Sequence, residues 1–157
     1  MPREIERKFL VASDSWRGRA VGVIYRQGYL STDPERIVRV RTAGDDAFLT
    51  VKGLTTGNSR LEFEYPIPFA DAEQMLALCK GPLVEKTRFE IPYAGKIWQV
   101  DEFLGDNLGL IVAEVELSSD ADRIELPDWI GNEVSSDPRY YNSSLTITLF
   151  SRWSQTA

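Results

Sequence analysis

The chain has 157 residues, 43% of them apolar and 27% charged, which is enough for one domain with a substantial core. Its net charge of −6 argues against a nonspecific nucleic-acid or membrane-surface binder. No signal peptide or membrane-spanning run is recognised, and a single cysteine predicts a reducing cytoplasm. The chain has no histidine, so histidine-based nucleophilic triads and histidine-ligated metal sites are excluded.

Most of the chain is predicted to form short strands separated by Gly, Asn, Asp and Pro. The predicted strands span 3–11, 23–31, 36–43, 47–53, 60–68, 84–93, 96–103 and 110–118. A helix is expected over 71–81, with Asp71 as N-cap and Gly81 as its end, and another over 120–126. The tail over 143–153 is compatible with a helix or a strand. We expect a mainly β (α+β) fold, an eight-stranded antiparallel barrel with a few peripheral helices, as a single domain over 1–157.

Charged residues recur at every second position of these strands. The first strand begins with Glu4, Glu6 and Lys8, and side chains two residues apart on a strand share one face. Later strands continue the pattern with Arg39, Arg41, Lys52, Glu62, Glu64, Lys86, Arg88, Asp101, Glu114 and Glu116. Seven strands therefore carry charges on one face and mostly apolar residues on the other.

Two arrangements fit this alternation. In an ordinary half-buried sheet the charged faces would turn to water. In a closed barrel they could instead line the interior, where so many charges would need partners or a ligand. A polyphosphate with Mg²⁺ or Mn²⁺ would match both the positive and the negative side chains, because basic groups bind phosphate oxygens and carboxylates bind the metal.

The charged segments resemble those of the CYTH superfamily, the triphosphate tunnel metalloenzymes. Its Glu-x-Glu-x-Lys signature matches residues 4–8. The segments "RQGYL", "RVR", "TVK", "LEFEY", "EKTR", "VDEF", "AEVE" and "DPRYYNSSL" follow in the family's order, so the resemblance covers essentially the whole chain.

The resemblance implies a tunnel that binds triphosphate with divalent metal, Mg²⁺ or Mn²⁺, two ions per site with substrate bound. It assigns the phosphates to Lys8, Arg39, Arg41, Lys52, Lys86 and Arg88. It assigns one metal to Glu4, Glu6 and Glu116, and a second metal or the attacking water to Glu64, Asp101 and Glu114, with Glu62 beside them. Direct catalytic roles are expected for Glu4, Glu6, Lys8, Lys86 and Glu114.

The compact length and the "EIERKFLV" and "RQGYL" segments favour hydrolysis of inorganic tripolyphosphate to pyrophosphate and phosphate. Class IV adenylyl cyclase and nucleoside or thiamine triphosphatase are the alternatives. A polyphosphate-binding module without activity is a further one, although it would not need seven carboxylates. The expected partner is a small triphosphate, without membrane or nucleic acid, and a homodimer is an open alternative.

Other residues receive structural interpretations. Glu90 and Glu102 are assigned to the outer face, and Arg7 is expected to point outward. Tyr29 is interpreted as a partly buried barrel aromatic, with a contact to the substrate as the alternative. Packing outside the barrel is expected for Trp16, Trp98, Trp129 and Trp153, and Cys79 is expected to be inert core.

Overall fold

A computed structural model describes residues 3–140 of the chain. Its strands are β1 (Arg3–Val11), β2 (Val23–Ser31), β3 (Ile37–Ala43), β4 (Asp46–Lys52), β5 (Ser59–Pro66), β6 (Lys80–Tyr93), β7 (Lys96–Phe103), β8 (Ile111–Glu116) and β9 (Ile130–Glu133). Its helices are α1 (Phe69–Leu78) and two single 3-10 turns, η1 (Gly105–Asn107) and η2 (Pro138–Tyr140).

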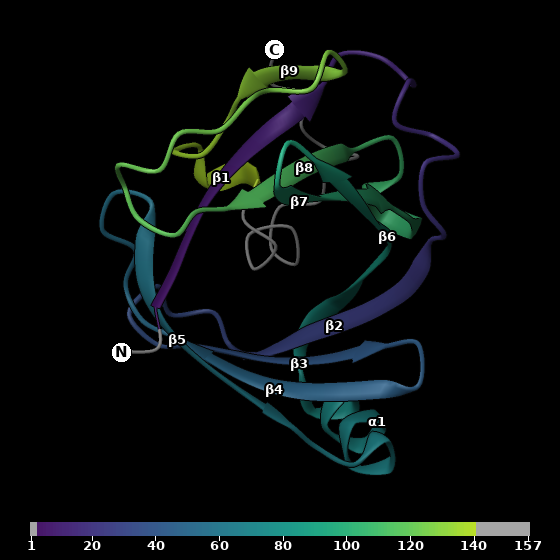
Figure 1. Ribbon diagram of the computed structural model, residues 1–157. Helices are drawn as coiled ribbons and strands as arrows, with labels where there is room; N and C mark the ends of the chain where they lie inside the picture. The colour runs from purple at the N-terminus through teal and green to yellow at the C-terminus, as the bar shows by residue number, and fades with distance from the viewer. Residues whose placement is uncertain (1–2, 141–157) are drawn as a thin grey trace.

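The strands form one antiparallel sheet that closes on itself (Figure 1). Its order is β5-β4-β3-β2-β6-β7-β8-β1, and β1 also pairs with β5, which completes the barrel. The edge of β1 is divided, because residues 3–5 pair with β5 whereas Phe9 and Val11 pair with β9. The predicted eight-stranded barrel is confirmed, and β9 is an additional short strand.

The outward faces of the barrel carry most of the apolar core. Trp16, Trp98 and Trp129 are almost fully buried and pack with Phe9 and Val100 on the outside of β1 and β7. The Trp98 and Trp129 rings meet edge to face, with centroids 6.0 Å apart. The expected packing of these tryptophans outside the barrel is therefore confirmed.

Helix α1 covers the outside of the barrel at β3 and β4. Ala72 and Leu76, one turn apart, pack against Val40 and Ala47. Its backbone begins after Pro68, with Asp71 in the first turn, so the predicted N-cap at Asp71 is wrong. Gly81 lies in β6, and the helix ends before Cys79.

Inside the barrel, one end is filled by apolar side chains. Val84, Phe103 and Val112 share the inward faces of their strands with Lys86, Asp101 and Glu114, and they form a buried cluster with Leu110. Tyr140 packs against this cluster. The charged inward positions consequently lie on the other side of an apolar floor.

Two sequence expectations differ from the structure. Residues 120–126 form no helix, because the Asp122 carboxylate accepts hydrogen bonds from the Ser118 backbone N–H and hydroxyl in a turn. Strand β9 was not predicted, because Gly131 and Asn132 have poor strand propensity. Its extended conformation is stabilised by pairing with β1.

The ambiguous tail over 143–153, with Trp153, lies outside the described residues. Within residues 3–140, no helix combines the length and the hydrophobicity that a membrane span requires.

Candidate functional site

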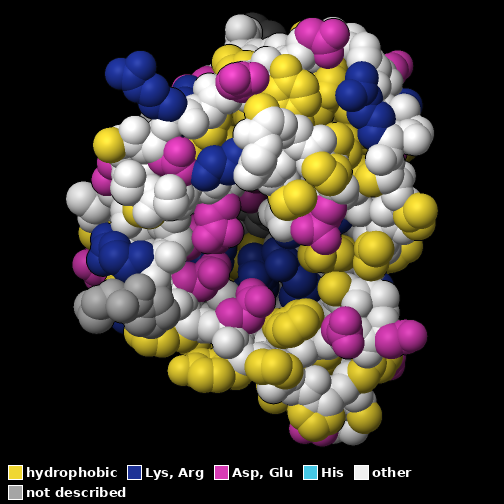
Figure 2. All heavy atoms as spheres, in the orientation of Figure 1, with side chains coloured by type: hydrophobic (Ala, Val, Ile, Leu, Met, Phe, Trp, Pro, Cys, Tyr) yellow, Lys and Arg dark blue, Asp and Glu magenta, His cyan; other side chains and the backbone are white. Residues whose placement is uncertain are grey.

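The barrel interior holds a cavity of about 500 Å³. In the space-filling view it opens on one face, where acidic side chains surround the opening and basic side chains lie deeper inside (Figure 2). Strands β1 and β3 to β8 all contribute charged side chains. The basic ones are Lys8, Arg39, Arg41, Lys52, Arg60, Arg88 and Lys96, and the acidic ones are Glu4, Glu6, Glu62, Glu64, Glu90, Glu114 and Glu116.

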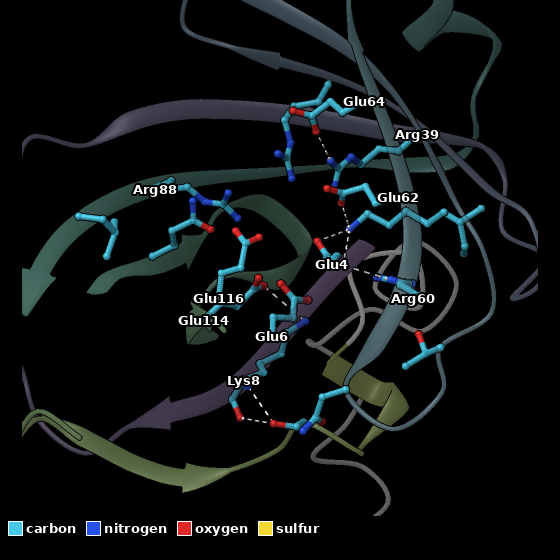
Figure 3. A pocket seen from close by; sticks show the side chains of 18 of the residues that line it. Glu4, Glu6, Lys8, Arg39, Arg60, Glu62, Glu64, Arg88, Glu114 and Glu116 are labelled. Atoms are coloured by element: carbon cyan, nitrogen blue, oxygen red, sulfur yellow. Dashed lines mark hydrogen bonds and ion pairs between the residues drawn. The ribbon is translucent and has the colours of Figure 1, made fainter. Parts of the chain in front are cut away.

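Several of the basic groups are paired with carboxylates of the same cavity (Figure 3). The Lys52 ammonium lies 3.2 Å from a Glu4 oxygen and 3.1 Å from a Glu62 oxygen. Lys8 lies 3.5 Å from Glu114 across the β1–β8 pair. Lys52 and Glu62 come from consecutive strands, whereas Lys52 with Glu4 and Lys8 with Glu114 come from strands far apart in the sequence that the barrel brings together.

The pair of Arg39 with Glu64 is looser. Arg39 Nη2 lies 3.4 Å from Glu64 Oε2 and also donates to the Thr50 hydroxyl at 3.2 Å. The Arg39 Nε is buried and has no hydrogen-bond partner within the described part of the chain. A buried donor of this kind costs free energy until an acceptor reaches it.

Asp101 holds two basic residues at the deep end of the cavity. Its carboxylate accepts from Lys86 Nζ at 2.7 Å and from Arg88 Nε and Nη2 at 2.7 and 2.8 Å. Burial lowers the pKa of Lys86 well below its ordinary value, although Asp101 opposes this shift. Burial would raise the pKa of Asp101, but Arg88 and Lys86 reverse the shift and lower it, so Asp101 stays ionised.

Arg41 lines the cavity without an acidic partner within residues 3–140. Its Nε donates to the Gln27 side-chain oxygen at 3.1 Å. Burial, together with Arg39 and Arg88 nearby, lowers the pKa of Arg41 to about 9. Among residues 3–140 this guanidinium forms no ion pair with a carboxylate and lies beside other cations, which is a favourable position for a bound anion.

Carboxylates crowd together on β1 and β8. Glu6 faces Glu116 directly across the strand pair, and Figure 3 shows Glu6, Glu114 and Glu116 with their carboxyl groups near one another. Burial, with Glu114 and Glu4 acting in the same direction, raises the pKa of Glu6 to about 8. Burial likewise opposes ionisation of Glu114, but Lys8 and Arg88 hold its pKa well below the ordinary value.

This donor set suits a hard divalent cation. Among residues 3–140, however, no three acidic or cysteine side chains are arranged to hold a metal ion by themselves. Mg²⁺ typically uses one or two carboxylates and takes its remaining ligands from water and substrate phosphates. The carboxylates therefore fit a metal that shares its coordination with a phosphate ligand.

Most of the charged residues singled out in the sequence reach this cavity. Eleven of the thirteen line it, whereas Lys86 and Asp101 lie behind its wall and are 0% and 1% exposed. Glu102 binds Arg17 and Arg7 binds Glu133 on the outer surface, as expected. The assignment of Glu90 to the outer face is wrong, because it shares the inward face with Lys86 and Arg88 and lines the cavity.

Several polar residues of the site were missed. Arg60 lines the cavity and donates to Glu4 at 3.2 Å, and its place two residues before Glu62 could have revealed it. Gln27 is fully buried and donates to the Tyr29 hydroxyl at 3.0 Å. Alternation puts Gln27 on the same face as Tyr29, which the sequence did single out, but the uncharged Gln27 side chain gave no signal of its own.

Comparisons with known proteins agree on one family. The model of the CYTH domain matches residues 2–146. A protein from Acetivibrio thermocellus named inorganic triphosphatase is 51% identical over 146 residues, covering 92% of this chain and 94% of the relative. One from Nitrosomonas europaea with the same name is 40% identical over 151 residues, covering 93% and 98%.

A solved structure agrees with these sequence relatives. The crystal structure of the inorganic triphosphatase NE1496 aligns with a TM-score of 0.67 at 36% identity, covering 93% of this chain and 95% of that one. The resemblance noted in the sequence therefore extends to the three-dimensional fold. The chain belongs to the CYTH domain family.

Proposed function

We propose that the protein hydrolyses inorganic triphosphate with water to pyrophosphate and phosphate, in the presence of a divalent cation. The observation that carries the proposal is Arg41, a cavity-lining guanidinium without an acidic partner in the described structure, placed beside Arg39 and Arg88. The names of the two curated relatives support inorganic triphosphate as the substrate.

The basic residues bind the phosphates in this proposal. Arg41 and Arg88 bind the phosphate chain first, because Arg41 has no acidic partner in the part of the chain that the structure describes and Arg88 is anchored by Asp101. Arg39, Lys8 and Lys52 join when the substrate and its cation loosen their contacts with the carboxylates. Lys86, behind the wall, adds positive potential and is oriented by Asp101.

The acidic residues hold the cation and the attacking water. Glu6, Glu114 and Glu116 lie together on β1 and β8, and Glu4 lies with Glu62 beside Lys52. With Glu64, these carboxylates would supply oxygen ligands for Mg²⁺ or Mn²⁺. A bound divalent cation would neutralise phosphate charge and favour ionisation of a bound water. In this proposal Asp101 orients Lys86 and Arg88 and does not bind the cation, because both of its oxygens already accept hydrogen bonds from these residues.

Phosphoryl transfer depends mainly on alignment and charge neutralisation. The barrel wall fixes the basic side chains on short strands, so little reorganisation is needed when the leaving pyrophosphate develops charge. Without histidine, a carboxylate or the phosphate itself must accept the proton of the attacking water.

The test is a product assay on the purified protein. Tripolyphosphate, ATP and thiamine triphosphate are incubated with Mg²⁺ or Mn²⁺, and phosphate, pyrophosphate and cyclic AMP are measured separately. We expect equal amounts of phosphate and pyrophosphate from tripolyphosphate, and no release in EDTA. Tight binding of tripolyphosphate without product in either metal would instead support a binding module.

A further inference from the structure

Two arginines of the cavity approach one aromatic ring. The guanidinium carbon of Arg41 lies 5.0 Å from the centroid of Tyr25, and that of Arg88 lies 4.9 Å from the same centroid. Arg41 comes from β3 and Arg88 from β6, and β2 lies between these two strands. The Tyr25 ring therefore has a guanidinium from each neighbouring strand.

The register explains this arrangement. Arg41 pairs with Gln27 and Arg88 pairs with Val23, so each arginine is one diagonal step from Tyr25 on the inward face. Tyr25 is half-buried at this place. A side chain at 25 is thus the one on β2 that can touch both arginines.

Gln27 fixes the rotation of the Arg41 guanidinium. Its side-chain oxygen accepts from Arg41 Nε, and its amide donates to the Tyr29 hydroxyl, so the amide orientation is determined. Arg41 Nη1 and Nη2 make no hydrogen bond to any residue of the described chain. The outer edge of the guanidinium is left available to an oxyanion.

Building on the proposed function, we infer that Tyr25 is a positioning residue that sets the spacing of Arg41 and Arg88 for two neighbouring phosphates of the substrate. Stacking on an aromatic face leaves the N–H edges of a guanidinium directed sideways, where they can donate to phosphate oxygens. The ring also offsets part of the repulsion between the two cations while no substrate is bound. Gln27 assists by fixing the rotation of Arg41.

Loss of the Tyr25 ring should weaken the binding of those ligands that contact both arginines. Without the ring, Arg41 keeps one neutral hydrogen-bond partner among the described residues and can move away from Arg88, whose position is fixed by Asp101. A triphosphate then loses simultaneous contact with both groups. A single orthophosphate, which needs one arginine only, should be little affected.

The test compares Tyr25→Leu with Tyr25→Phe, which keeps the ring. We expect Tyr25→Leu to raise the KM for tripolyphosphate with Mg²⁺ about tenfold, the factor that corresponds to one cation–π contact. Calorimetric titration in EDTA should show the same factor in the Kd for tripolyphosphate, while the inhibition constant of orthophosphate changes less than about twofold. Tyr25→Phe should stay within about twofold of the wild type in all three measurements.

Tyr65→Leu is the matched control, because this tyrosine lies on β5 and is 57% exposed. Gln27→Met is similar in volume but offers no acceptor to Arg41 Nε. It should weaken the binding of tripolyphosphate several-fold and the binding of orthophosphate to a similar extent. Thermal melting establishes that each variant is folded. If folded Tyr25→Leu retains the wild-type KM and Kd for tripolyphosphate, the positioning role is overturned and the proposed function stands. If the wild type neither binds nor hydrolyses tripolyphosphate, both the positioning role and the proposed function are overturned.

Discussion

Glu6 and Glu114 place two carboxyl groups side by side in the barrel interior, and only one of them is held firmly ionised. Lys8 and Arg88 lower the pKa of Glu114, whereas burial and the neighbouring acids raise that of Glu6 to about 8. The two neighbours thus differ in charge at neutral pH before a cation binds. A cation that binds beside these two carboxyl groups would favour the ionised form of Glu6 as well.

Stability without metal should therefore depend on pH through Glu6. A carboxyl whose pKa is higher in the folded than in the unfolded state stabilises the fold below the unfolded value of about 4.3, and this contribution is lost as pH rises through 8. Glu6→Gln should raise the melting temperature by several degrees at pH 8.5 in EDTA, and by clearly less at pH 6. A Glu6→Gln gain that is the same at both pH values would contradict the raised pKa of Glu6.

Loss of Arg41 should remove most turnover and leave the fold intact. Of the four arginines that line the cavity, Arg41 is the one without an ion pair to a carboxylate among residues 3–140. In Arg41→Gln, kcat/KM for tripolyphosphate should therefore fall by about 10²–10³. Arg36→Gln is the control, because Arg36 is an exposed partner of Asp33. Steady-state kinetics with melting curves measure both; activity of Arg41→Gln near that of Arg36→Gln would exclude Arg41 from substrate binding.

Asp101 should matter for stability more than any surface carboxylate. Asp101→Asn leaves Lys86 and Arg88 buried without their counter-charge, which typically costs about 3–5 kcal/mol. The exposed pair of Asp137 with Arg139 offers a comparison, and Asp137→Asn should cost less than about 1 kcal/mol. Urea unfolding at pH 7.5 measures both, and equal losses in the two variants would show that the buried pair is not needed for stability.

The outer tryptophan cluster should affect folding without affecting substrate affinity. Trp98 is fully buried on the outside of β7, away from the charged cavity. Trp98→Leu should lower the free energy of unfolding by roughly 2–4 kcal/mol through lost packing, while KM for tripolyphosphate stays unchanged. A raised KM in a folded Trp98→Leu protein would mean that the outer cluster shapes the cavity.

The sequence by itself determined which side chains share a face. A strand alternates with a period of two residues, so Glu4, Glu6 and Lys8 had to lie together, as did Arg39 with Arg41 and Glu114 with Glu116. The eight short strands with few helices were sufficient to predict the barrel, and the ordered motifs were sufficient to indicate the family. The same rule, applied to 86, 88 and 90, would have placed Glu90 correctly.

Only the tertiary structure decided what each charge meets. Pairing of β1 with β5 closes the sheet and turns the charged faces inward, and alternation alone cannot distinguish inward from outward. Strand register decides that Asp101 binds Lys86 and Arg88 across the β6–β7 pair. It also decides that Arg41 contacts Gln27 and Tyr25 across the β2–β3 pair, and pairing with β1 orders β9. The first two sets of contacts join strands that are consecutive in the chain, and the third joins strands far apart. In all three the geometry depends on register and barrel curvature, which local sequence preferences do not encode.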